Sequence, residues 1–210
     1  MKLHSKEQLS KQPKKSKPDE VKSEEAEQKT AKKPFAPTKE GYLQFLVDSL
    51  AVYVAFEEAV AASSPPSELA KLQKTGMERT QALTADIAWM CEEYGLAEPS
   101  RSERGLGYAE KIVGLGKDNA PGFVCHFYNH YFAHTAGGLM IGKMVRESAL
   151  GGAKLNFYKW DGNVAEHKKK LKLVIDGVAA EWSEEERQKC VTETAASFKF
   201  GGGLMKPLRD

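Results

Sequence analysis

Residues 122–142 have the sequence GFVCHFYNHYFAHTAGGLMIG, and this stretch decides which fold class the chain can adopt. It contains no Asp, Glu, Lys or Arg, and no alternating run of β-branched residues competes with a helix. It is long enough to span a bilayer, but its three histidines, its asparagine and its glycines are unfavourable in a lipid-facing helix. The stretch therefore predicts a buried helix in a protein that does not enter the membrane.

Three histidines form a row within this stretch. His126, His130 and His134 are spaced i, i+4 and i+8, which places them on one face of a helix. One interpretation is a polar seam of buried imidazoles that are satisfied by hydrogen bonds. Another is a metal site, although zinc and di-iron sites need carboxylate or cysteine partners and no Glu-x-x-His motif accompanies the row.

Two adjacent glycines, Gly137 and Gly138, follow the row. Glycine weakens a helix and permits a kink, and it lets the backbone approach a neighbouring group closely. Ala133 and Ala136 keep the surrounding surface small. The pair predicts either a tight contact between helices or a helix that bends across a planar ligand.

The sequence on either side of this stretch also predicts helices. From an expected N-cap at Thr38, apolar residues recur every three or four positions, and Pro65 and Pro66 end the helix. The apolar stripe consists of Tyr42, Leu46, Leu50, Tyr53, Phe56 and Val60. Further helices are expected over residues 67–94 with a break near Gly76 and a C-cap at Gly95, over 107–115, from about 121, from 161 or 162 to 182, and from a Ser183–Glu186 capping box to the glycines at 201–203.

The predicted fold class is therefore all-α, a single-domain bundle of six or seven helices with sites between facing helices. The expected organisation is an N-terminal segment over residues 1–8, a charged flexible linker over 9–37, a helical body over 38–204 and a C-terminal tail over 205–210. The linker is dominated by Lys, Glu, Ser, Gln and Pro, which bury too little apolar surface to offset the entropy of ordering.

Charge and cysteine content exclude several classes of protein. The chain of 210 residues has 31 Lys and Arg against 29 Asp and Glu, a net charge of +2, which argues against a nucleic-acid binder. Residues 1–33 hold ten Lys and six acidic residues, so the leader is basic and the body mildly acidic. Cys91, Cys125 and Cys190 are odd in number and far apart, which predicts neither a disulfide framework nor a zinc ribbon.

The same residues resemble the haem oxygenase family. Residues 125–138 resemble its distal helix in the form found in the plant and algal branch, and other motifs of that branch recur in the same order. These are residues 3–8 (LHSKEQ), 40–43 (EGYL), 45–49 (FLVDS), 75–79 (TGMER), 157–162 (FYKWDG), 181–182 (EW) and 197–199 (SFK). The resemblance extends from residue 3 to about residue 200 and implies an all-α domain.

The resemblance implies an enzyme that cleaves haem at the α-meso carbon to biliverdin IXα, carbon monoxide and ferrous iron. Haem would be substrate and cofactor, O2 the oxidant, and reduced ferredoxin the source of electrons, since the sequence has no nucleotide-binding GxGxxG motif. The product would feed the synthesis of bilins and the phytochrome chromophore. Expected partners are ferredoxin and a downstream bilin reductase, the expected location is the plastid stroma with the targeting peptide absent from this chain, and the expected state is a monomer.

The resemblance also implies roles for individual residues. His4 matches the axial ligand of the haem iron, and Gly137 and Gly138 match the glycines that press on the haem. His134 stands where many relatives have a carboxylate, and with His130 and Tyr53 it would hold a water that supplies a proton during oxygen activation.

Four further residues are expected around the edge of the haem. Lys170 and Lys172 would contact the propionates as point charges, and Tyr128 and Phe198 would pack at the haem edge. Two alternatives remain beside this interpretation. One is a haem-binding relative without turnover, although His4 argues against it, and the other is a non-haem helical metal or interaction protein that uses the His126, His130 and His134 row.

Overall fold

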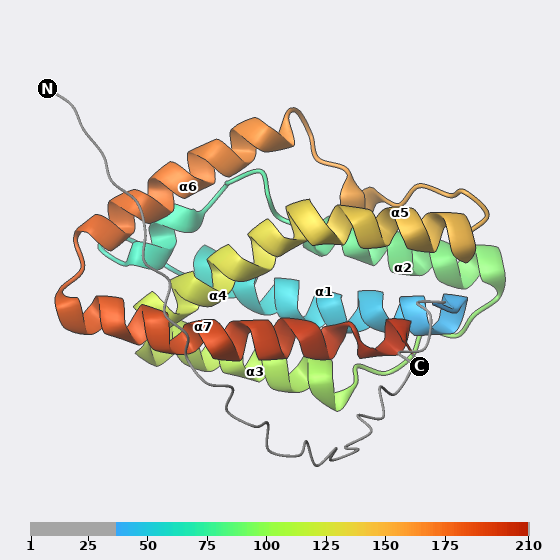
Figure 1. Ribbon diagram of the computed structural model, residues 1–210, viewed down its shortest axis with the longest axis horizontal. Helices are drawn as coiled ribbons and strands as arrows, with labels where there is room; N and C mark the ends of the chain where they lie inside the picture. Colours follow the sequence, from blue (N-terminus) through green and yellow to red (C-terminus); the bar gives the residue numbers. More distant parts are fainter. Residues whose placement is uncertain (1–36, 210) are drawn as a thin grey trace, which may run out of the picture. The chain divides into compact units, whose positions relative to one another are not determined.

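The computed structural model describes residues 37–209, and this part of the chain is helical, as predicted. The predicted segment 1–8 with His4, and all of the linker 9–37 except Pro37, lie outside the described residues. The α-helices are α1 (Lys39–Ala61), α2 (Thr80–Tyr94), α3 (Glu103–Asp118), α4 (Ala120–Ala133), α5 (Leu139–Ser148), α6 (Val164–Ala180) and α7 (Glu184–Leu204) (Figure 1). The shorter elements are the 3-10 segments η1 (Glu68–Leu72), η3 (Asn156–Tyr158) and η4 (Lys206–Leu208) and the π-helical turn η2 (His134–Gly138).

Helix α1 is buried on most of its circumference. It begins at the predicted N-cap, where the hydroxyl of Thr38 accepts a hydrogen bond from the backbone N–H of Gly41 at 3.0 Å. Residues between the predicted stripe positions, such as Leu43 and Val52, are as inaccessible as the stripe itself. The predicted single stripe was too narrow because α2, α3 and η4 all pack against α1.

Helix α3 is longer than the sequence predicted. The expected range was 107–115, but the helix begins at Glu103 because Asp48 of α1 fixes its first turn. The buried Asp48 carboxylate accepts hydrogen bonds from the backbone N–H of Ser102 at 2.8 Å and from its hydroxyl at 2.6 Å. A residue 54 positions earlier thus starts the helix, which local spacing does not reveal.

The region 67–94 is broken, as predicted. Gly76 has φ of 76° between η1 and α2, and α2 ends at Gly95 in the left-handed conformation with φ of 63°. The capping box at Ser183 and Glu186 is also present at the start of α7.

The predicted end of α7 was wrong. The helix continues through Gly201, Gly202 and Gly203 to Leu204, so packing outweighs the low helix propensity of glycine. Beyond it, Pro207 and Leu208 of η4 are buried and η4 packs against α1.

The uncharged stretch forms α4, η2 and the start of α5 in continuous helical geometry. The predicted kink occurs as a π-helical turn that contains Gly137 and Gly138, and α4 and α5 run in different directions on its two sides (Figure 1). Between residues 37 and 209, none of the helices has the combination of length and apolar character needed to cross a membrane. Helix α4 packs mainly against α7, and this pairing creates the site described below.

The close approach of α1 and α3 gives a test of this packing. A Cβ on Gly105 would lie 2.9 Å from the Cα of Asp48, whereas one on Gly107 would meet nothing within 4 Å. Gly105→Ala is expected to lower the free energy of unfolding by about 1–3 kcal/mol because the two backbones must separate. The matched variant Gly107→Ala is expected to raise it by up to about 1 kcal/mol through helix propensity. Urea denaturation of both variants measures the difference, and equal effects would contradict the packing.

Candidate functional site

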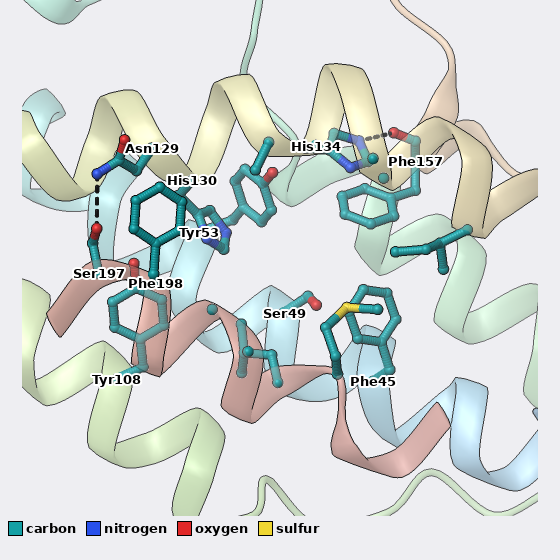
Figure 2. Close-up of a pocket in the computed structure, with 18 of the residues that line it drawn as sticks. Phe45, Ser49, Tyr53, Tyr108, Asn129, His130, His134, Phe157, Ser197 and Phe198 are labelled. Carbon is teal, nitrogen blue, oxygen red and sulfur yellow. Dashed lines mark hydrogen bonds between the residues drawn. The ribbon is translucent and has the colours of Figure 1, made fainter. Parts of the chain in front are cut away.

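A cavity of about 350 Å³ lies between α4, η2 and α5 on one side and α7 on the other, with α1 and α3 completing its walls (Figure 2). Its lining is mostly apolar, and among the described residues that line it none carries a formal charge at neutral pH. The lining residues are Phe45, Ser49, Tyr53, Tyr108, Asn129, His130, Ala133, His134, Gly137, Gly138, Ile141, Phe157, Tyr158, Ser197, Phe198, Gly201, Gly202, Leu204 and Met205.

Glycines line this cavity from two facing helical segments. A Cβ on Gly137 of η2 would meet no described atom within 4 Å, and the same holds for Gly201 and Gly202 of α7. The space next to these backbones is therefore open, and side chains there would project into it. A gap between two bare helical backbones suits a flat, bulky group that must be approached closely from both faces.

His134 is held in one orientation by the segment after α5. Its Nε2 lies 2.8 Å from the backbone oxygen of Phe157, and its ring stacks on the Phe157 ring with centroids 4.0 Å apart (Figure 2). Burial lowers the pKa of His134 to about 4, although the bond to Phe157 opposes the shift. His134 is thus neutral at pH 7, and because a carbonyl only accepts, Nε2 carries the proton and Nδ1 keeps a lone pair.

The missing side chain of Gly138 leaves room for that lone pair. A Cβ on Gly138 would lie 2.8 Å from Nδ1 of His134, which is closer than van der Waals contact allows. Both residues line the cavity. Glycine at this position therefore keeps the accepting nitrogen of His134 accessible from the cavity.

The carbonyl that holds His134 is itself fixed by Asp86 of α2. The carboxylate of Asp86 is buried and accepts hydrogen bonds from the backbone N–H groups of Asn156 at 2.9 Å and Phe157 at 2.6 Å. Burial raises the pKa of Asp86, and these hydrogen bonds act in the opposite direction. Asp86, Phe157 and His134 thus form a connected support across three elements, which the sequence pattern did not reveal.

His130 is buried differently from its neighbours in the row. Its ring lines the cavity and lies among the rings of Tyr53, at 4.7 Å, and Phe56, at 5.6 Å. Its Nε2 is buried and has no hydrogen-bond partner among the described residues. Burial lowers the pKa of His130 to about 3, so the imidazole is neutral at pH 7.

His126 is fully satisfied and does not line the cavity. Its Nδ1 lies 3.2 Å from the Tyr108 hydroxyl and its Nε2 lies 3.1 Å from the Glu193 carboxylate. The predicted polar seam therefore describes His126, whereas His130 and His134 line the cavity. Hydrogen bonds engage both nitrogens of His126 and the Nε2 of His134, and no group of three potential metal ligands comes together among the described residues.

The other predicted site residues divide into two groups. Tyr53 and Phe198 line the cavity, and Phe198 is 64% exposed at its margin. Tyr128 is not among the lining residues; its ring stacks on Phe132 with centroids 4.3 Å apart. Lys170 and Lys172 of α6 do not line the cavity either, and Lys172 pairs with Asp176 at 2.6 Å.

Several lining residues were not predicted as site residues. Asn129 donates a hydrogen bond to the Ser197 hydroxyl at 2.7 Å and so joins α4 to α7 at the cavity wall (Figure 2). Gly201 and Gly202 were interpreted as a helix end. Their lack of side chains could instead have indicated a second helix whose backbone lies open at the cavity. Phe45 and Ser49 share one face of α1 with Tyr53 at steps of four, a signal present in the spacing.

The comparisons agree with this geometry. A family model described as "Heme oxygenase" matches residues 14–206. "Heme oxygenase 1, chloroplastic" of Arabidopsis thaliana is 39% identical over 206 residues, covering 98% of this chain and 70% of that protein. The rice protein of the same name is 41% identical over 170 residues, covering 81% of this chain and 58% of that protein. The chain therefore belongs to the haem oxygenase family.

Two further matches are a relative that is named as probably inactive and a solved structure. "Probable inactive heme oxygenase 2, chloroplastic" of Arabidopsis thaliana is 35% identical over 170 residues, covering 81% of this chain and 56% of that protein. The crystal structure of heme oxygenase-1 from the cyanobacterium Synechocystis in complex with heme superimposes with a TM-score of 0.70 at 18% identity, covering 82% of this chain and 77% of that one. At this identity the second match supports the fold alone.

The buried histidines predict how stability depends on pH. In the folded protein the pKa of His130 is lowered to about 3, and an unfolded chain restores a value near ~6.5. The unfolded state therefore binds more protons below pH 6.5, and the stability present above that pH is lost as the pH falls toward the folded value.

For the haem-free protein, we expect the free energy of unfolding to fall between pH ~6.5 and ~4 by up to about 1.4 kcal/mol per pH unit for each such histidine. His130→Phe is expected to reduce this slope because it removes one buried base. Urea denaturation at several pH values measures the slope. The same slope in both proteins would contradict the burial of a neutral His130.

Proposed function

We propose that this chain is a haem oxygenase that cleaves haem oxidatively at the α-meso carbon to biliverdin IXα, carbon monoxide and ferrous iron. The observation that carries the proposal is the apolar cavity between the bare backbones of Gly137 and of Gly201 and Gly202, with the neutral His134 at its wall. Haem is flat and largely apolar, and such a gap lets both faces meet backbone. The buried Nε2 of His130, which has no hydrogen-bond partner in the part of the chain that the structure describes, adds a polar group beside it.

Haem bound in the cavity would supply the iron that binds O2 and the porphyrin carbon that is oxidised. The residues of the chain would bind and orient it. Gly137 and Gly138 would contact one face, and Gly201 and Gly202 would lie toward the other. Phe45, Phe157 and Ile141 would exclude water from the apolar part of the cavity.

His134 would position a water molecule rather than act as the acid itself. Its pKa of about 4 means that little imidazolium exists at pH 7. Its Nδ1 lone pair can accept a hydrogen bond from a water in the cavity, while Nε2 remains bonded to Phe157. Such a water can then pass on a proton that comes from solvent. His130 and Tyr53, which line the same wall, would limit the positions open to this water.

The charged substituents of haem would extend outside the cavity, because the described lining is uncharged. Phe198 would pack against the haem edge from the margin. Contacts of Lys170 and Lys172 with the propionates remain a prediction, and Lys172 already donates one hydrogen bond to Asp176. Packing of Tyr128 at the haem edge likewise remains a prediction, and its ring stacks on Phe132.

His4 would be the axial ligand of the iron, as its flanking sequence implies, and it lies outside the described residues. Reduced ferredoxin would supply the electrons. Ferredoxins are acidic, so a surface rich in cations would suit their docking. A groove of about 210 Å³ is lined by four cations, and Tyr158 lines both this groove and the cavity. The four cations are Lys143, Arg146, Lys154 and Lys159.

The setting of the reaction would be the plastid stroma, since curated relatives are named chloroplastic. A monomeric enzyme there would pass biliverdin to a bilin reductase for synthesis of bilins and the phytochrome chromophore. The probable inactive relative makes loss of turnover the competing possibility, and the presence of His4 favours activity.

Haem titration of the full chain tests the proposal. We expect one haem to bind with the spectrum of an axial histidine complex, and reductant with O2 to convert it to biliverdin. His4→Ala is expected to change that spectrum. Gly137→Leu is expected to abolish haem binding, because its side chain enters open space in the cavity without disturbing the helix. Gly114→Leu, on α3 outside the lining, is the matched control that keeps binding.

Haem binding without biliverdin would favour the relative that lacks turnover, and the absence of haem binding would refute the proposal. Metal analysis of protein purified without haem checks the remaining alternative, a non-haem site built on the histidine row.

The role of His134 has a separate test. His134→Ala is expected to keep haem binding but to slow biliverdin formation by about a hundredfold, the lower range for loss of a proton-transfer group. His167→Ala is the matched control, since the Nε2 of His167 also bonds a backbone oxygen, that of Asp161, and the residue does not line the cavity. Single-turnover absorbance of the two haem complexes measures the effect. Equal rates would refute the role assigned to His134.

A further inference from the structure

A chain of hydrogen bonds connects the surface between α3 and α7 to the wall of the cavity. Lys111 of α3 donates to Oε1 of Glu193 on α7 at 2.8 Å. Oε2 of Glu193 lies 3.1 Å from Nε2 of His126 on α4, and Nδ1 of His126 lies 3.2 Å from the hydroxyl of Tyr108 on α3. Tyr108 lines the cavity (Figure 2), so the chain ends at the site.

The charges in this chain fix which atom donates in each bond. Partial burial raises the pKa of Glu193, but its bonds to Lys111 and His126 outweigh that effect, so the net pKa is lowered and the carboxylate is ionised at pH 7. An ionised carboxylate only accepts, so Nε2 of His126 must carry the proton. Burial lowers the pKa of His126, which is therefore neutral and keeps a lone pair on Nδ1. The Tyr108 hydroxyl must then donate to Nδ1.

Packing prevents Tyr108 from escaping this arrangement. Its ring is 1% exposed and stacks on Phe200 with centroids 4.9 Å apart and an interplanar angle of 15°. His126 is fully buried, so bulk water does not compete for its nitrogens. Turning the hydroxyl away would leave the buried Nδ1 of His126 without a donor, so donation to Nδ1 is the favoured direction while His126 carries its proton on Nε2.

We propose that Glu193, acting through the tautomer of His126, sets the direction in which the Tyr108 hydroxyl donates and so keeps this proton out of the cavity. Glu193 and His126 are positioning residues, and the wall of the cavity at Tyr108 carries an accepting oxygen rather than a donor. Only the effect on a ligand in the cavity rests on the proposed function. The direction of the hydrogen bonds follows from Lys111, Glu193, His126 and Tyr108 alone.

Glu193→Gln reverses the direction without changing the shape of the side chain. Lys111 is a donor only, so it retains the amide oxygen of Gln, and the amide NH2 then faces Nε2 of His126. His126 must present a lone pair there and carry its proton on Nδ1. That proton is donated to the Tyr108 oxygen, and the Tyr108 hydroxyl proton must then point away from His126.

The tautomer is measured in the haem-free protein by long-range 1H–15N correlation of labelled histidines, with His126 assigned by its absence from the spectrum of His126→Gln. We expect the Nε2–H form in the wild type and the Nδ1–H form in Glu193→Gln. Adding Lys111→Met to Glu193→Gln frees the amide to rotate and is expected to restore the Nε2–H form. Lys111→Met alone leaves the Glu193 carboxylate in place, so we expect His126 to remain in the Nε2–H form.

The consequence for the cavity is measured on the haem complex. We expect Glu193→Gln to change the rate of biliverdin formation by about three- to tenfold, the value of one hydrogen bond, and the Lys111→Met, Glu193→Gln protein to return toward the wild-type rate. Glu185→Gln removes the same charge from the exposed face of α7, where Glu185 pairs with Lys189, and is expected to change neither readout. If the wild type forms no biliverdin, the absorption spectrum of the haem complex replaces the rate.

An unchanged tautomer in Glu193→Gln would overturn the proposal. A changed tautomer with an unaltered haem complex would overturn the positioning role. The first result does not depend on the proposed function, because the tautomer is read without haem. The second requires haem binding alone, because the absorption spectrum replaces the rate where no biliverdin forms.

Discussion

The π-helical turn at residues 134–138 is the constraint on which the site depends. It lies between α4 and α5 and brings His134 to the carbonyl of Phe157, while Gly137 faces open space. A regular α-helix through the same residues would rotate one of these groups away, because each added residue in the turn shifts the faces that follow. The turn therefore gives one segment both a bare backbone and a fixed imidazole.

The support for this turn comes from distant parts of the chain. Asp86 fixes the backbone at Phe157, and the α4–α7 pairing supplies the opposing glycines. The site thus depends on contacts between elements more than on any local motif. This explains why the three histidines of one row have different environments. His126 is satisfied in a seam, the Nε2 of His130 has no partner within residues 37–209, and His134 is held by a carbonyl.

The sequence predicted the all-α class, the start of α1, the break at Gly76 and the kink at Gly137, because these depend on local periodicity and on glycine. It missed the start of α3, which Asp48 fixes from α1. It also ended α7 too early at the glycines, because helix propensity says nothing about the packing that holds them. Of the predicted site residues, those on α1, α4, η2 and α7 that face inward were found at the cavity. Tyr128, Lys170 and Lys172 were not, because the type of a residue does not tell in which direction its side chain points or how far it lies from the site.

The uncharged lining of the cavity separates two contributions to ligand binding. Within the described lining, the contribution to affinity comes from apolar contact and shape, which dissolved salt hardly affects. Any attraction for an anionic ligand must arise from cations in the solvent-exposed surface, where ions at 0.15 M screen charges over about 8 Å. Ionic strength should therefore alter how fast and how tightly such a ligand is captured, while leaving its orientation in the cavity unchanged.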